Sequence, residues 1–184
     1  MRFNPHLELE GAHAFLSPSK YHWVNDNEEK LVNRYSNYKA VQTGVELHNF
    51  ASHAIKKRIK LARYKKALYM FVNDAIGYNM ESEQMLYYSP YCFGTADAIC
   101  FRDNYLRVFD LKTGVSKPSF IQLDTYAAIF CLEYGQDPEA ITIELRIYQG
   151  AGYEERFPDP VEIRYIMEKI VDFTHLLNEI DSSL

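Results

Sequence analysis

Two aspartates and a lysine stand where their side chains could converge. Asp97 lies in one segment with the composition of a β-strand (94–101), and Asp110 lies in the next such segment (105–111), with Lys112 just after it. Carboxylate oxygens are the ligands that hard divalent cations such as Mg²⁺ prefer. A lysine beside such a cation can stabilise negative charge that develops on a phosphate. Whether the three side chains meet depends on how the two segments pair.

The link between the segments favours a tight hairpin. Asp103 and Asn104 both tolerate positive φ, so they predict a two-residue type I′ turn. That turn places Asp97 opposite Asp110, with the two Cβ atoms roughly 4.5–5.5 Å apart. Lys112 then points to the same face, about 7 Å further along the strand.

Two ionised carboxylates at that separation repel each other. Either one carboxyl is protonated, with a raised pKa, or a divalent cation lies between them. The competing interpretation is that Asp97 and Asp110 are unrelated surface residues. Unpaired acids are costly on an apolar face. The predicted face also carries apolar residues: Ile99, Phe101, Leu106 and Val108.

The pattern of apolar residues predicts four helices and four strands. The helices are expected over about 38–60, 64–76 and 118–132 and from Asp159-Pro160 onward, and the strands over 85–88, 94–101, 105–111 and 141–147. In the last strand, Glu144 and Arg146 alternate with apolar residues and are expected on the opposite face. This order predicts an α/β protein with a mixed central sheet flanked by helices. The length of 184 residues suits one domain, with residues 1–36 as an N-terminal extension.

Positive charge is concentrated in one run, although the chain has a net charge of −5. Seven of the eleven residues from Lys56 to Lys66 are basic, among them Lys60 and Arg63. The run is either a solvated helix face or a surface that binds nucleic-acid phosphates.

The remaining composition predicts a cytosolic protein with no membrane segment. The start of the chain lacks the pattern of a signal peptide, and no apolar stretch approaches the ~20 residues that span a bilayer. The three cysteines have no CxxC spacing, so they are expected to be buried thiols in a reducing compartment.

Several short motifs, taken together, resemble the PD-(D/E)XK nuclease superfamily and, within it, the RecB-type branch that includes phage recombination exonucleases. The central motif is carried by Gly94-Thr95-Ala96-Asp97 and Phe109-Asp110-Leu111-Lys112. Thr43-Gly44-Val45-Glu46-Leu47-His48 is similar to the G-x-x-x-H helix motif, and Gln122-Leu123-Asp124-Thr125-Tyr126 to the Q-x-x-x-Y motif. Ser17-Pro18-Ser19 is similar to a serine-containing motif near the start of related phage proteins.

This resemblance implies a restriction-endonuclease-like αβββαβ core and a set of site residues. Asp97, Asp110, His48 and the Leu111 carbonyl would bind Mg²⁺ or Mn²⁺, and Lys112 would be the catalytic lysine. Gln122, Tyr126 and Ser19 would contact DNA with Lys56, Lys60 and Arg63, although Ser19 could instead cap a helix. Glu46 would at most contact a metal ligand and would not bind the cation itself. Three cysteines cannot hold the four-cysteine iron–sulfur cluster of some relatives.

The implied activity is metal-dependent hydrolysis of DNA, as an exonuclease in phage-type recombination, replication or repair. Any recombinase, single-strand-binding protein or helicase would be a separate chain. The expected location is the cytoplasm, which would be the host's if the protein is phage-encoded. Two alternatives stay open: a non-catalytic DNA- or protein-binding protein on the same fold, and a sequence-specific endonuclease.

Overall fold

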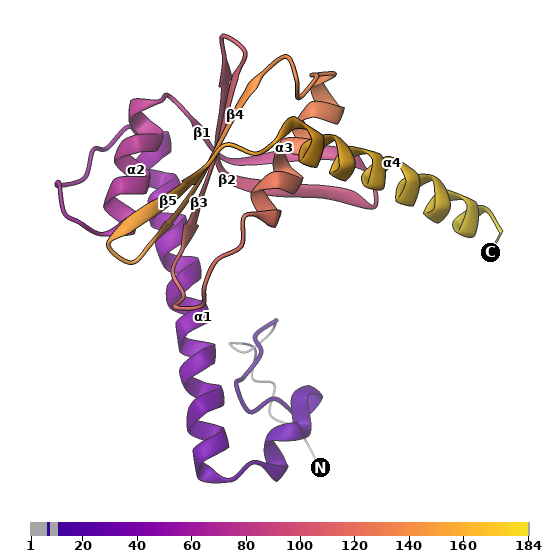
Figure 1. Ribbon diagram of the computed structural model, residues 1–184. Coiled ribbons are helices and arrows are strands. Elements are labelled where there is room, and N and C mark those ends of the chain that lie inside the picture. The colour runs from indigo at the N-terminus through magenta and orange to yellow at the C-terminus, as the bar shows by residue number, and fades with distance from the viewer. Residues whose placement is uncertain (1–6, 8–10, 184) are drawn as a thin grey trace. The chain divides into compact units, whose positions relative to one another are not determined.

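The computed structural model describes residues 7 and 11–183 and divides the chain into two compact units (Figure 1). The units are Met1–Val45 and Glu46–Leu184, so the boundary lies within helix α1 (Glu28–Lys56). In the first unit, a 3-10 helix (Pro18–Asn25) precedes α1. Helix α1 begins about ten residues earlier than the pattern indicated.

The second unit is built on one five-stranded mixed sheet with the order β1-β2-β3-β4-β5. Only the β3–β4 pair is parallel, and the other neighbours are antiparallel. The strands are β1 (Glu81–Ser89), β2 (Cys92–Arg102), β3 (Tyr105–Lys112), β4 (Thr142–Gln149) and β5 (Gly152–Arg156). The predicted mixed sheet with flanking helices is therefore confirmed, whereas β5 was not predicted.

The β2–β3 hairpin has the predicted turn and register. Asp103 and Asn104 have φ values of 52° and 58°, as a type I′ turn requires. The strand pairs run from Arg102 opposite Tyr105 to Ala98 opposite Phe109. The ladder ends there, one pair before Asp97 would face Asp110, so the two aspartates are not a regular cross-strand pair.

Helices cover both faces of the sheet (Figure 1). Helices α3 (Ile121–Tyr134) and α4 (Pro160–Ser182) pack against one core, which contains Leu106, Val108 and Leu145. Helix α2 (Ala67–Gly77) and the last turns of α1 pack against the second core, which contains Phe109 and Leu111. Successive residues of β3 therefore alternate between two apolar cores, which fixes the direction of each side chain at the end of the strand.

Helix α4 begins as predicted. The Asp159 carboxylate accepts a hydrogen bond from the Val161 N–H (2.9 Å), and Pro160 occupies the first turn. None of the helices in the described part of the chain is long and apolar enough to cross a membrane. Of the three cysteines, which are all free thiols, only Cys131 is fully buried, so the prediction was too strong for Cys92 and Cys100.

The basic run does not lie on a helix. Helix α1 ends at Lys56 and α2 begins at Ala67, so most of the run forms the loop between them. Arg58 has a positive φ of 56°, which ends the helical conformation. The interpretation of the run as a solvated helix face is therefore wrong, and these side chains belong to a connecting loop.

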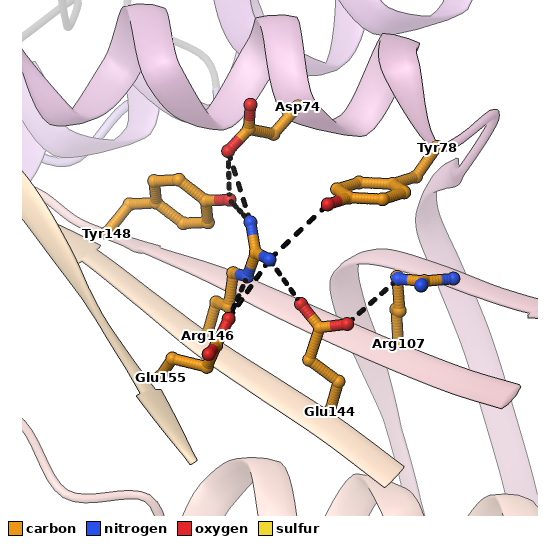
Figure 2. A network of polar contacts seen from close by, with 7 residues as sticks. All are labelled: Asp74, Tyr78, Arg107, Glu144, Arg146, Tyr148 and Glu155. Atoms are coloured by element: carbon orange, nitrogen blue, oxygen red, sulfur yellow. Dashed lines mark hydrogen bonds and ion pairs between the residues drawn. The ribbon is translucent and has the colours of Figure 1, made fainter. Parts of the chain in front are cut away.

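The polar face of β4, which the alternation placed opposite the apolar one, is buried as well. Glu144 and Arg146 are only 2% and 8% exposed. They form the centre of a network between the sheet and α2, in which Arg146 contacts Glu144, Glu155 and Asp74 (Figure 2). Arg107 adds a second cation to Glu144 at 2.9 Å. Mutual pairing is what makes the burial of these charges tolerable.

Candidate metal centre

Asp97 lies at an irregular position of strand β2. Ala98 packs in the core beneath α1 and α2, whereas Ala96, two residues earlier, packs in the core beneath α3. Residues two apart in a regular strand share a face, so the alternation of side chains between the two faces of the sheet is interrupted at Asp97. On the neighbouring strand, Glu83 has a φ of 54°, which interrupts β1 at the same level. Asp97 is thereby freed from the ladder to contact other elements.

The Asp97 carboxylate joins β3 to α1. Its Oδ2 atom accepts a hydrogen bond from the Leu111 N–H (2.8 Å) and lies 3.4 Å from His48 Nδ1. The hydrogen bond with Asp97 raises the pKa of His48 above its ordinary value, although burial opposes this. The G-x-x-x-H segment thus does bring its histidine to Asp97, as predicted. Leu111 is joined to the site through its N–H, and the role of its carbonyl stays a prediction.

Asp110 and Lys112 form the second half of the site on the α3 side of β3. Asp110 is 4% exposed. Lys112 Nζ donates hydrogen bonds to Asp110 Oδ1 (3.1 Å) and to Gln122 Oε1 (2.8 Å). Burial is the main cause that raises the pKa of Asp110, and the negative charge of Asp97 raises it further, while Lys112 opposes the shift. The negative charge of Asp97 thus acts on Asp110, although the predicted direct pairing of the two residues across the hairpin is not formed.

Glu83 is a site residue that the sequence did not reveal. His48, Glu83 and Asp97 each offer one ligand atom, and these atoms all lie within 4.8 Å of one another. Burial and the nearby Asp97 raise the pKa of Glu83. Nothing in the local pattern indicated it, since a glutamate with positive φ is uncommon and the irregularity of β1 arises from packing.

The arrangement suits a hard divalent cation. Asp110 Oδ2 lies 3.0 Å from Lys112 Nζ but outside hydrogen-bond geometry, and within residues 11–183 it accepts no hydrogen bond. Glu83 and Asp97 thus lie together with His48, and Asp110 lies against Lys112, with the charge of Asp97 acting on both Glu83 and Asp110. Oxygen ligands with one histidine nitrogen fit Mg²⁺ or Mn²⁺ better than softer metals.

The Q-x-x-x-Y segment lies on α3 and contacts both strands of the hairpin. Gln122 holds Lys112, as described above. The Tyr126 hydroxyl donates to the Thr95 carbonyl at 2.7 Å, and the Tyr126 ring lies against Gly94, where an added Cβ would stand 3.0 Å from the ring. Gly94 therefore permits the close contact between the strand and the helix. Tyr126 was predicted to bind substrate, but its hydroxyl already binds the backbone of β2.

The other predicted residues belong to other segments of the chain. Glu46 is exposed on α1, and two residues of separation direct it away from the side of the helix that carries His48. Ser19 belongs to the first unit, where its hydroxyl lies 2.8 Å from that of Ser17. Lys56 ends α1, and Lys60 and Arg63 lie in the following loop.

No protein-family model, no curated protein and no solved structure matches this chain. The resemblance to the PD-(D/E)XK superfamily therefore stays a prediction that rests on the motifs quoted above.

Proposed function

We propose that the protein is a Mg²⁺- or Mn²⁺-dependent deoxyribonuclease. The observation that carries the proposal is the position of Lys112, whose ammonium group lies between buried Asp110 and Gln122. The carboxylate of Asp97 and the imidazole of His48 complete the site. Acidic ligands with an adjoining lysine at one end of a hairpin could hold a divalent cation and stabilise the charge that develops on a phosphate.

Each residue has a distinct task in this proposal. Asp97, Asp110 and His48 would hold the cation, with the Leu111 carbonyl as a further ligand and Glu83 as a candidate beside His48 and Asp97. When bound, a divalent cation polarises a phosphate oxygen and lowers the pKa of a coordinated water. Lys112 stabilises the negative charge that develops on the phosphate. The side-chain carbonyl of Gln122 accepts a hydrogen bond from the ammonium group of Lys112 and keeps it directed toward the site.

The basic loop supplies the affinity for DNA. Contacts from Lys56, Lys60 and Arg63 to backbone phosphates would attract DNA of any sequence. By analogy with the RecB-type branch, we propose exonuclease action in phage-type recombination, replication or repair, in the cytoplasm of the cell that makes the protein. A recombinase, single-strand-binding protein or helicase would act as a separate partner.

The decisive experiment compares purified wild-type protein with two variants on end-labelled linear DNA and on closed circular DNA. With Mg²⁺ or Mn²⁺ we expect cleavage of linear DNA, and with a chelator none. Asp110→Asn should lose cleavage because a neutral amide is a poor ligand for a hard cation. Lys112→Ala should still bind the cation and DNA, yet cleave about 10²–10³-fold more slowly.

Two outcomes would replace the proposal. If the wild-type protein binds DNA but cleaves neither form with either cation, it is a non-catalytic binding protein on this fold. If closed circles are cut at a fixed sequence, it is a site-specific endonuclease. Wild-type cleavage by both variants would remove Asp110 and Lys112 from the mechanism.

A further inference from the structure

An open cavity lies between the basic loop and helix α2, apart from the carboxylate cluster. Its volume is about 530 Å³, which is within the usual range of roughly 300–1,000 Å³ for small-ligand sites. The wall from the loop carries three cations and one aromatic ring: Lys60, Arg63, Lys65 and Tyr64. Leu61 and Met70 contribute apolar surface. Cationic groups beside an aromatic and apolar wall suit a ligand that has both negative charge and a flat ring.

The loop is held in one conformation by α2. The Asn73 side chain accepts a hydrogen bond from the Leu61 N–H (2.9 Å) and donates one to the Leu61 carbonyl (3.0 Å). Arg58 reaches the end of α2, where its guanidinium group donates to the Ile76 carbonyl. A loop fixed at two points presents its side chains without a large entropic cost on binding.

The opposite wall is fixed by the buried network. Asp74 borders the cavity, and its Oδ2 atom accepts a hydrogen bond from the Tyr148 hydroxyl at 2.7 Å and lies 3.4 Å from Arg146 (Figure 2). Arg146 therefore offsets the negative charge of this carboxylate, which would otherwise repel an anion in the cavity.

The cations of the loop are available for a ligand. Within the described residues, Lys60, Arg63 and Lys65 make no ion pair with an acidic side chain. Tyr64 is 62% exposed, and its ring meets Tyr69 edge-on at 5.5 Å, which leaves a ring face open. Exposed aromatic rings beside basic side chains are the combination that binds single-stranded nucleic acids.

We propose that this cavity binds one nucleotide unit of a single-stranded DNA, with its phosphate on Lys60, Arg63 and Lys65 and its base on Tyr64. This inference rests on the proposed function, because DNA is the substrate of the proposed nuclease. Duplex DNA does not fit the cavity in the same way, because its bases are stacked and paired inside the helix. The site is therefore specific for an unpaired strand.

The cavity is connected to the end of the sheet that carries Lys112. The Ala67 N–H, at the end of the loop, donates to the Gly150 carbonyl at 2.9 Å. Gln149, the neighbour of Gly150, pairs with Lys112 in the β3–β4 ladder. The end of the loop is thus tied to the turn between β4 and β5, at the end of the sheet where β3 ends, while the cavity itself lies on the α2 face and the Lys112 side chain on the α3 face.

The test measures binding with a chelator present, so that it stays readable even if the protein cleaves nothing. The probes are a fluorescein-labelled oligothymidylate and the same sugar–phosphate backbone with abasic sites, followed by fluorescence anisotropy. Tyr64→Ala should weaken binding of oligothymidylate by roughly 5- to 100-fold and leave the abasic probe unaffected, since stacking needs a base. Tyr64→Phe should bind as the wild type does.

A charge-matched pair of double variants tests the phosphate contacts. Lys60→Ala/Arg63→Ala should weaken binding of both probes and lower the salt dependence by about 1.4 logarithmic units per decade. Lys57→Ala/Lys66→Ala removes the same charge from positions that do not line the cavity, and its loss should be much smaller.

Three results would overturn the proposal. If both double variants lost the same binding affinity, the basic run would attract DNA as a whole and the cavity would not be a distinct binding site. An equal effect of Tyr64→Ala on the abasic probe would exclude base stacking. Thymidine monophosphate that competes as tightly as the oligonucleotide would make the ligand a free nucleotide instead of a strand.

Discussion

The sheet carries two clusters of charge that differ in how their charges are balanced. Around Arg146, every carboxylate lies against a guanidinium group: Glu144 contacts both Arg107 and Arg146, and Asp74 and Glu155 contact Arg146. Tyr148 adds a hydroxyl group to the same network (Figure 2). The charges of this cluster are thus balanced within the chain, although Glu144 Oε1, like Asp110 Oδ2, makes an ion pair and no hydrogen bond among the residues that the structure describes.

Around Asp97 the balance is different. Glu83 and Asp97 lie together with His48, and Asp110 lies against Lys112. Burial and the nearby negative charge of Asp97 raise the pKa values of Glu83 and Asp110, although His48 opposes both shifts. The carboxylates of such a cluster repel one another unless one of them is protonated or a cation binds between them. The comparison separates a network whose charges are paired within the chain from a cluster in which, under the proposed function, a divalent cation would relieve the repulsion.

Removal of the central cation of the network should have the largest effect. Arg146→Met leaves Glu144 and Asp74 without their shared partner, and breaking a buried ion pair destabilises a protein by about 3–5 kcal/mol. The free energy of unfolding from urea titration measures the loss. Arg164→Met is the control, because Arg164 pairs with Asp137 and Glu139 on the exposed surface, and it should change little. Equal losses would show that the network is no more important than a surface pair.

Addition of a divalent cation should have the next largest effect, and only at the Asp97 cluster. At a concentration 100 times its Kd, a ligand that binds only the folded state stabilises it by about 2.7 kcal/mol. Mn²⁺ should therefore raise the melting temperature by roughly 5–10 °C over the chelated protein. Asp110→Asn should lose this shift, whereas Glu155→Gln, which removes a carboxylate from the network, should keep it. A shift that survives Asp110→Asn would place the cation elsewhere.

Gln122 offers a smaller change within the site. Gln122→Ala removes the acceptor that orients Lys112, so cleavage should fall roughly tenfold, in line with a hydrogen bond of about 1.5 kcal/mol to a charged group. The Mn²⁺-dependent melting shift should be unchanged, and Gln122→Glu, which keeps an oxygen acceptor, should recover most of the activity. A lost Mn²⁺ shift in Gln122→Ala would make Gln122 part of the metal site and not a positioning residue.

Local signals account for the parts that the sequence predicted well. The Asp103-Asn104 turn sets the register of the hairpin through its positive φ values, and the Asp159 cap sets the start of α4. Lys112 follows Asp110 by two residues, so their shared face needs only strand periodicity. These features depend on neighbours in the chain, and hence a sequence pattern can reveal them.

Features that depend on distant partners escaped prediction. Glu144 and Arg146 have the pattern of a solvated face, and only the packing of α2 on the sheet reveals that they are buried. Strand β5 is short and exposed, with no apolar alternation to indicate it. Glu83 reaches the site because β1 and β2 are irregular at the same level, a property of the pair of strands and not of either alone.

The smallest expected effect is the pH dependence of the carboxylate cluster without a cation. The folded-state pKa of Asp110 lies above its ordinary value of 3.8, so the folded state binds the proton more tightly than the unfolded state. Stability contributed by this group is thus present at low pH and is lost as the pH rises from about 3.8 through the folded-state pKa. Asp110→Asn cannot ionise and should escape this loss. In chelator at neutral pH the variant should be more stable than the wild type by about 0.2–1 kcal/mol, the usual scale for like charges on neighbouring strands.

Urea titrations of the two proteins at a series of pH values measure this difference directly. The two free energies of unfolding should converge as the pH falls below 3.8, where the wild-type carboxyl becomes protonated in both states. Glu155→Gln provides the contrast, because the wild-type carboxylate lies 3.0 Å from Arg146 and its loss should not stabilise the protein at neutral pH. If Asp110→Asn instead destabilises the chelated protein at neutral pH, the contact with Lys112 outweighs the repulsion from Asp97. The Asp97 cluster would then be balanced internally, as the Arg146 network is, and the contrast between the two would disappear.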